Sequence, residues 1–258
     1  LFINSAITTI STAHGAPVIA AQRLRKGACN SARGAHRLIA DTLASVRRLR
    51  STDASGPVLV RADSAFYGHR AVSAAIGAGA QVSVTVRQDL RIRAAISEIA
   101  ADAWTKIEYT DAIRDETTGR WISKAEVAEV PFIAFRSRKK AERVDGRLVV
   151  RRIPDLNPNK VEQPTLFDTY RHHAFFTTTD KQTMGTVAAD KTHRGHAIIE
   201  QVHADLKSSA LAHLPSGKFT ANAAWLVLAI MAFNLTRTAA TLAGADLARA
   251  TTATIRRK

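Results

Sequence analysis

Five polar residues stand in single file between positions 193 and 207. The segment HRGHAIIEQVHADLK carries His193, His196, Glu200, His203 and Lys207 at steps of three or four residues. In an α-helix this spacing places all five side chains on one face. Imidazoles and carboxylates ligate metal ions, and an ammonium group pairs with phosphate. The spacing therefore predicts a helix with a chemically active face. Its apolar side would consist of Ile198, Ile199, Val202 and Leu206.

The residues of this face alone allow two other interpretations. His196, Glu200 and His203, at i, i+4 and i+7, could hold zinc. However, HxxxExxH is not the HExxH spacing of zinc peptidases, which disfavours a zinc site. A solvated amphipathic face without any chemistry is the second alternative.

Another acid lies at the end of an apolar run. PVLVRAD (57–63) predicts a buried parallel strand that ends in Asp63, and the polar loop SAFYG follows it. An acid at the carboxyl end of a strand in an α/β crevice is a common site geometry. Carboxylate oxygens are also the ligands that Mg²⁺ prefers. The structural alternative for Asp63 is the N-cap of the following helix.

The elements that must position these residues alternate in the first part of the chain. Apolar periodicity, glycines and prolines predict an α/β fold that opens with a hairpin. The predicted order is strand 1–12, strand 16–24, helix 35–50, strand 57–63, helix 69–80, strand 81–88 and helix 89–104.

The pattern changes after Trp104. Segments of alternating residues separated by charged turns predict a β-rich insertion over residues 104–176. Its basic runs, 136–143 and 151–152, either contact phosphates or form solvated hairpin tips. Helices are predicted again over 187–209 and 219–243. The predicted domains are 1–103 with Asp63, the insertion 104–176, and 177–258 with Glu200 and the C-terminal helices.

The charge of the chain points to a polyanionic partner. The 258 residues include 37 Lys and Arg against 22 Asp and Glu, a net charge of +15. Nucleic acid is the first expectation and an anionic membrane surface the weaker one. Cys29 is the single cysteine, so no intramolecular disulfide can form, and we expect a cytosolic protein. The apolar run Ala221 to Leu235 is shorter than the ~20 residues of a membrane span, which favours a core helix.

Taken together, these motifs resemble the DDE transposases of the ribonuclease-H-like fold. The family signature Tyr-x2-Arg-x3-Glu-x6-Lys has the spacing of His193, His196, Glu200 and Lys207. The segments 23–34, 58–68, 150–158 and 191–237 are similar to the group 1 DDE-domain transposases of bacterial insertion sequences, of the insertion sequence 1380 type. The resemblance covers essentially the whole chain.

This resemblance implies a mixed sheet with flanking helices and two-metal phosphoryl transfer on DNA with Mg²⁺ or Mn²⁺. Asp63 and Glu200 would be catalytic metal ligands, and Lys207 would contact a phosphate of the transposon end. His193, His196 and Lys218 are further expected DNA contacts. The two histidines replace the Tyr and Arg of the signature, so the roles of those residues do not carry over. A homodimer that pairs two DNA ends, at the bacterial nucleoid, is expected.

One acid of the family triad has no match in the sequence. The family places its first Asp on the first, central strand of the sheet. Asp41 lies within a predicted helix and Asp53 lies in a linker. We therefore expect the first strand to lie upstream of Leu1, and this chain alone to be inactive in strand transfer. The alternatives are a metal-dependent nuclease of the same fold and an inactive DNA-binding fragment of a decayed element.

Overall fold

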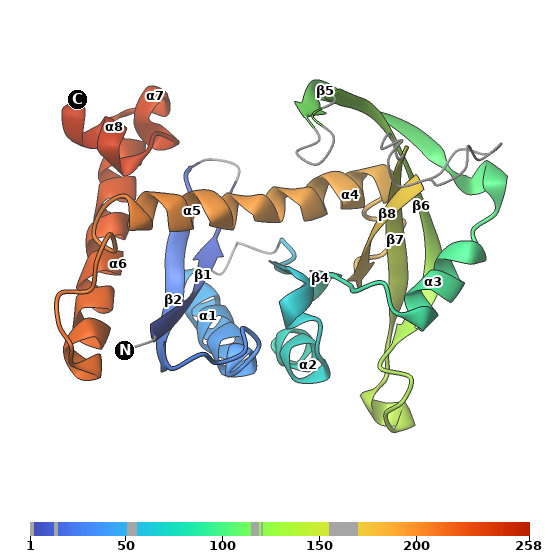
Figure 1. The fold of residues 1–258 in the computed structure, drawn as a ribbon, viewed down its shortest axis with the longest axis horizontal. Coiled ribbons are helices and arrows are strands. Elements are labelled where there is room, and N and C mark those ends of the chain that lie inside the picture. The colour runs from blue at the N-terminus through green and yellow to red at the C-terminus, as the bar shows by residue number, and fades with distance from the viewer. Residues whose placement is uncertain (1–2, 13–14, 51–55, 115–118, 120, 155–169) are drawn as a thin grey trace. The chain divides into compact units, whose positions relative to one another are not determined.

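The chain forms two compact units. The computed structural model describes residues 3–12, 15–50, 56–114, 119, 121–154 and 170–258. Unit 1 comprises Leu1–Pro57, Arg70–Ala80 and His196–Lys258, and unit 2 comprises Val58–His69 and Gln81–Gly195. Figure 1 labels the elements of both units.

Unit 1 contains a β-hairpin and most of the helices. Strands β1 and β2 pair antiparallel, with a register shift between Thr8 and Thr9. The hairpin lies between α6 and α1 (Figure 1), and β2 contacts both helices. The elements of this unit are β1 (Ile3–Ile10), β2 (Val18–Lys26), α1 (Ala35–Leu49), α2 (His69–Gly77, which starts in unit 2), α5 (Ile198–Lys207), α6 (Phe219–Ala243), α7 (Ala245–Ala248) and α8 (Thr252–Arg257).

The core of unit 1 joins β2, α5 and α6. Its apolar side chains exclude water from the seam between the hairpin and the two helices. Ile7, Leu24 and Leu211 pack around this core as partly buried residues. The buried members are Ile19, Val202, Leu206, Leu226, Ile230 and Phe233.

Two asparagines of α6 bind backbone amides of other elements. Asn234 Oδ1 accepts the Ile19 N–H and Asn234 Nδ2 donates to the Ile19 carbonyl, each at 2.8 Å. Asn222 is fully buried and makes the same pair of contacts with Ser216, at 3.2 and 2.7 Å. Each side chain thereby satisfies one N–H and one C=O that a strand or helix would otherwise satisfy. These contacts fix the position of α6 against β2 and against the loop before α6.

Helix α6 is long and apolar enough to cross a membrane by length and composition alone, and a third of its apolar stretch is buried. One face packs inward through Leu226, Ile230 and Phe233, and Asn222 and Asn234 make polar contacts within the unit. These contacts agree with the predicted core helix, and its bounds match the predicted range 219–243.

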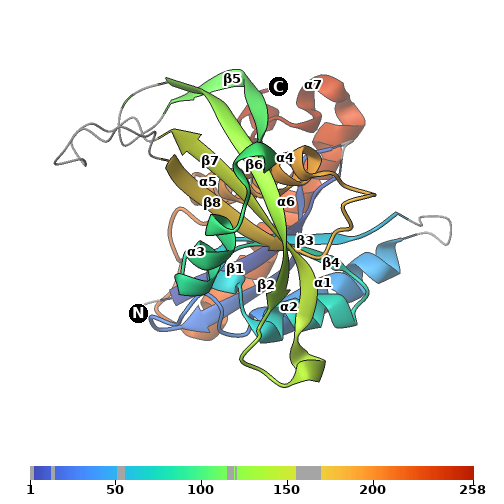
Figure 2. The same ribbon diagram turned by 90° about the vertical axis from the view of Figure 1, so that its right-hand side faces the viewer.

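Unit 2 is built on a six-stranded mixed sheet of order β3-β4-β8-β7-β6-β5. Strands β3 and β4 are parallel, and the other neighbours are antiparallel. Helices α4 and α3 lie on opposite sides of the sheet (Figures 1 and 2). The elements are β3 (Leu59–Ala62), β4 (Gln81–Thr85), α3 (Leu90–Ser97), β5 (Thr105–Arg114), β6 (Trp121–Ala134), β7 (Val144–Pro154), β8 (Tyr170–Thr177) and α4 (Thr186–Arg194).

The segment predicted as an insertion belongs to this sheet. Strands β5 to β8 cover most of residues 104–176, as the alternating pattern predicts. However, β8 also pairs with β4, next to the strand that carries Asp63. The strands of 104–176 therefore continue the sheet of β3 and β4, a long-range pairing that no local pattern in the sequence indicates.

The architecture is mixed α/β, with helices flanking a mixed sheet, and it is compatible with a ribonuclease-H-like fold. In the described part of the chain, β1 and β2 pair with each other and β3 is the outermost strand of its sheet. The strand expected before residue 1 stays a prediction.

Candidate active site

Asp63 lies where the sequence predicts it, directly after β3. The strand is parallel to β4, with Ala62 paired to Val84 at the carboxyl end. The Asp63 side chain is exposed, and its Oδ1 accepts the Ala65 N–H at 2.8 Å. This contact caps the short 3₁₀ helix Ser64–Phe66, so the N-cap alternative is also realised. The cap fixes the carboxylate at the end of the strand without burying it.

Tyr67 anchors the loop that follows Asp63. Its ring stacks on Phe135 with centroids 5.3 Å apart and also contacts Phe176. Burial, together with the negative charge of Asp89, raises the pKa of Tyr67 to about 12, against an opposing effect of Arg91. Tyr67 therefore stays neutral at physiological pH and holds the loop by packing. Tyr67 was not among the predicted site residues, although an aromatic residue four positions after the acid was a visible signal.

The segment His193–Lys207 is not one α-helix. Helix α4 ends at Arg194, a 3₁₀ turn covers Gly195–Ala197, and α5 starts at Ile198. The prediction that one α-helix places all five polar residues on one face is therefore wrong, because a 3₁₀ helix has 3.0 residues per turn rather than 3.6. His193 lies on α4 in unit 2, whereas Glu200 and Lys207 lie on α5 in unit 1.

His193 is buried against the sheet of unit 2. Its Nδ1 lies 2.8 Å from Ser83 Oγ and its Nε2 lies 3.0 Å from Thr85 Oγ1, on β4. The ring stacks on Phe175 with centroids 4.0 Å apart. Because only 6% of the residue is exposed, this position favours a structural role over the expected DNA contact.

The strand of Asp63 is tied to the C-terminal end of α4. Arg61 Nη1 donates to the Thr192 carbonyl at 2.7 Å. A side chain at Gly195 would bring a Cβ within 2.5 Å of that Arg61 nitrogen, so glycine leaves room for the guanidinium. Burial lowers the pKa of Arg61. Arg61 was not among the predicted site residues. The sequence feature that could have indicated it is an arginine inside the apolar run VLVRAD, two residues before Asp63.

The other end of α4 is held by a buried ion pair. Glu129 Oε2 accepts from Arg147 Nη1 at 2.5 Å and from Thr186 Oγ1, the first residue of α4, at 3.0 Å. Lys181 Nζ lies 3.1 Å from Glu129 Oε1. Burial alone would raise the pKa of Glu129, but hydrogen bonds from Lys181, Thr186 and Arg147 outweigh burial and lower it. This acid is fully engaged in holding α4 to the sheet.

Helix α5 presents the remaining signature residues to solvent. Glu200 and Lys207 are exposed, while Val202 and Leu206 are buried in the core of unit 1. His203 is half-buried. Burial, followed by the nearby charge of Lys207, lowers the pKa of His203.

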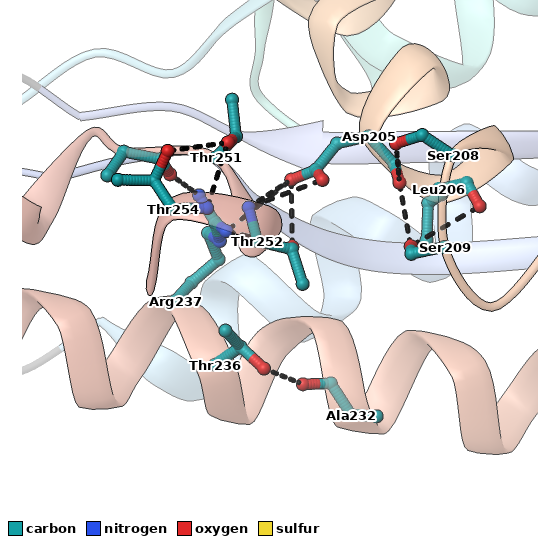
Figure 3. Close-up of polar contacts among 11 residues, drawn as sticks. Asp205, Leu206, Ser208, Ser209, Ala232, Thr236, Arg237, Thr251, Thr252 and Thr254 are labelled. Carbon is teal, nitrogen blue, oxygen red and sulfur yellow. Dashed lines mark hydrogen bonds and ion pairs between the residues drawn. The ribbon is translucent and has the colours of Figure 1, made fainter. Parts of the chain in front are cut away.

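A polar network fixes α5 from the side away from Glu200. Asp205 Oδ2 accepts from the Thr252 N–H at 3.1 Å and from Thr252 Oγ1 at 2.9 Å (Figure 3). Arg237 on α6 lies 3.4 Å from the same oxygen and donates to the carbonyl of Ala250. Burial lowers the pKa of Arg237, with the charge of Asp205 acting in the opposite direction. The network joins α5, α6 and α8 and so sets the orientation of the exposed face.

A sequence model of the transposase DDE domain, group 1, matches residues 12–258. The chain belongs to this family. No curated protein matches the sequence. Family membership shows the protein to be a DDE transposase, an enzyme of the polynucleotidyl transferase type that acts on DNA and generally uses divalent metal ions.

The two acids that the resemblance proposes as metal ligands lie in different units of this DDE transposase. Asp63 belongs to unit 2 and Glu200 to unit 1. Both carboxylates are exposed, and oxygen donors of this kind suit Mg²⁺ or Mn²⁺. Within the described residues, no group of three or more His, Cys, Asp or Glu side chains gathers to hold a metal. The zinc alternative depends on His196, whose side chain lies outside the described residues.

Lys218 precedes α6 in unit 1 of the transposase and is exposed. Its N–H donates to Ser216 Oγ at 3.0 Å, so the backbone is fixed while the ammonium group faces solvent. Asp41, one of the two rejected candidates for a first acid, lies on α1 and pairs with Arg23 at 2.5 Å. Asp53 lies outside the described residues.

Proposed function

We propose that the chain is the catalytic part of a bacterial insertion-sequence transposase of the insertion sequence 1380 type. It would cut DNA at the element's end and join the 3′-hydroxyl to target DNA. The observation that carries this proposal is Asp63, an exposed acid held at the carboxyl end of a parallel strand in a chain of this family. Glu200 and Lys207 support it, because α5 turns both to solvent while its apolar face is buried.

Each proposed residue has a distinct role. Asp63 and Glu200 would hold Mg²⁺ or Mn²⁺, which activates the attacking oxygen and stabilises the leaving oxygen in phosphoryl transfer. Lys207, two turns from Glu200 on the same helix, pairs as a point charge with a phosphate oxygen of the DNA end. Lys218 adds a second contact with the phosphate backbone of the DNA. His196 stays a proposed contact from sequence alone, and we leave His193 out because its ring is buried.

The first acid of the DDE triad would come from a further strand beside β3. β3 is the outermost strand of its sheet in the described part of the chain, so one of its edges is available for pairing. A chain without this acid would bind metal weakly and would not join DNA ends.

The proposed enzyme works as a homodimer at the bacterial nucleoid, because transposition needs two DNA ends held together. The excess of positive charge supports binding to DNA. Light scattering of the chain with a duplex carrying the element's end would show a complex of two copies with two duplexes. A complex of one copy with one duplex at saturating DNA would contradict the dimer.

A substitution at Asp63 tests the catalytic proposal. Asp63→Asn keeps an N-cap of equal quality but removes the negative charge. In a form of the protein that cleaves DNA, we expect metal-dependent cleavage to fall about 1,000-fold or more. Several kcal/mol of transition-state stabilisation depend on the metal. DNA affinity, measured by fluorescence anisotropy, should stay within about twofold of the parent.

Asp145→Asn provides the matched control, because Asp145 is an exposed acid of the same unit on β7. Cleavage by this variant should equal that of the parent. Cleavage that survives Asp63→Asn would refute the assignment. Cleavage without any joined product would favour a nuclease of the same fold.

A further inference from the structure

A basic pocket lies within unit 1, and its lining includes none of the signature residues. It has a volume of about 630 Å³ and is formed by β2, the loop before α1, the start of α1 and part of α6. This volume is in the range of pockets that hold small organic ligands. Five of the residues that line it are cationic: Arg23, Arg25, Lys26, Arg33 and Arg37.

The cations of the pocket far outnumber nearby acids. Among the described residues that line it, none is acidic, and Arg23 pairs with Asp41, which is not part of the lining. Arg25 Nη1 donates to three loop carbonyls, of which Ser31 is nearest at 2.8 Å, and neutral acceptors of this kind leave the positive charge in place. Positive charge gathered in this way attracts phosphate groups.

The fold holds the pocket in shape. The Arg25 bonds fasten the loop to β2, and the Lys26 ammonium lies 5.1 Å from the centre of the Phe219 ring at the start of α6. Arg33 and Arg37 are exposed at the rim. Part of the wall is apolar, from Leu24, Ala223, Ala224 and Val227. Apolar walls reduce the local dielectric constant and strengthen the attraction between cation and phosphate.

We propose that this pocket binds the phosphate backbone of a DNA strand, as a contact separate from the metal-binding acids. The proposal rests on the proposed function, because it assumes that the enzyme handles DNA. DNA is favoured over a single small anion because the cations come from β2, the loop and α1 and can contact successive phosphates. The net charge of +15 gives the same preference for a polyanion.

Cys29 is a natural probe of the pocket. It lines the pocket, is partly exposed, and is the single cysteine of the chain. We would measure the rate at which an uncharged maleimide labels it, with and without a 30-base-pair duplex. At a duplex concentration of about ten times Kd, labelling should slow about tenfold, because only ~1 pocket in 11 remains free.

A relocated cysteine is the control for this labelling. The variant Cys29→Ser with Ala239→Cys places the thiol at an exposed position of α6 that does not line the pocket. Its labelling rate should not change with DNA. Protection of Cys29 by millimolar inorganic phosphate, but not by the duplex, would overturn the assignment to DNA.

A pair of double variants on one segment tests the charges. Arg33→Ala with Arg37→Ala removes two rim cations, whereas Arg47→Ala with Arg48→Ala removes two exposed arginines of α1 that do not line the pocket. The slope of log Kd against log salt should fall by about two for the rim variant, at about one for each phosphate that is no longer bound. For the control variant it should fall by clearly less. Equal slopes in the two variants would overturn the proposal.

These results are separable from those on the catalytic proposal. If Cys29 labels equally fast while the duplex is bound and Asp63→Asn abolishes cleavage, the pocket proposal fails and the proposed function stands. If Cys29 is protected but cleavage survives Asp63→Asn, the catalytic assignment fails and the pocket stands.

Discussion

Helices α4 and α5 follow one another in the sequence and carry similar polar residues, but they use them in opposite ways. α4 directs His193 to Ser83 and Thr85 of the sheet and buries it. α5 leaves Glu200 and Lys207 in solvent and buries Val202 and Leu206 instead. One helix therefore uses polar groups for stability, and the other leaves them exposed to solvent. The difference shows that residue type and spacing did not reveal which polar residues face solvent.

The largest expected effect comes from the exposed acid of α5. Glu200→Gln should reduce metal-dependent DNA cleavage about 1,000-fold or more, because an amide is a poor Mg²⁺ ligand. The free energy of unfolding in urea should change by less than about 0.5 kcal/mol, as for most surface substitutions. A large loss of stability instead would mean that α5 uses its polar residues as α4 does.

The buried histidine of α4 should show the reverse pattern. His193→Ala leaves Ser83 and Thr85 without their partner and removes the ring from Phe175, so it should destabilise unit 2 by about 2–4 kcal/mol. Urea denaturation measures this, with His203→Ala on α5 as the control. The control should lose about 1 kcal/mol or less, because His203 is half-buried. Equal losses in both variants would remove the distinction between the helices.

The 3₁₀ turn that separates the helices allows a smaller test. Gly195→Ala should cost about 1 kcal/mol, because the new Cβ would displace Arg61 from the Thr192 carbonyl. In an Arg61→Ala background the same substitution should be nearly neutral, which a double-mutant cycle would show. Gly185→Ala, in open space before α4, is the matched control. A full cost of Gly195→Ala in the Arg61→Ala background would exclude a clash with Arg61 as the cause.

The smallest expected effect is on the pKa of His203. Burial and then the charge of Lys207 lower this pKa, so Lys207→Met should raise it, although burial keeps it below about 6.5. A group of this kind favours the neutral form in the folded state. Stability is therefore full above a pH of about 6.5 and declines as the pH falls from there through the lowered pKa. An NMR titration of the imidazole protons measures the change, and an unaltered pKa would show that Lys207 is remote from His203.

Local features of the fold could be predicted from the sequence. Apolar periodicity located α1 and α6, and a run ending in an acid located β3 and Asp63. These depend on neighbours in sequence. The pairing of β8 with β4 could not be predicted, because strands far apart in the chain meet through hydrogen bonds that no local pattern encodes.

The candidate site was predictable to a similar degree. The spacing of Glu200 and Lys207 survives in α5 because both lie within one uninterrupted helix. His193 failed the same reasoning, because Gly195 stands between and the chain forms a 3₁₀ turn there. The glycine can be seen in the sequence, but the need for it cannot. It leaves room for the guanidinium of Arg61, which bonds to Thr192 from 131 residues away in the chain. Tertiary contacts of this kind decided which residues are available to bind a ligand.

The contact between Asn234 and Ile19 has a consequence for assembly in the crowded cell. β2 is an outer strand of a two-stranded sheet, and outer strands offer free N–H and C=O groups that can recruit strands from other molecules. At Ile19 both groups are already bound by one amide side chain of α6. An incoming strand would have to displace that amide before it could pair there. A single asparagine thus opposes amyloid-like strand pairing at this position.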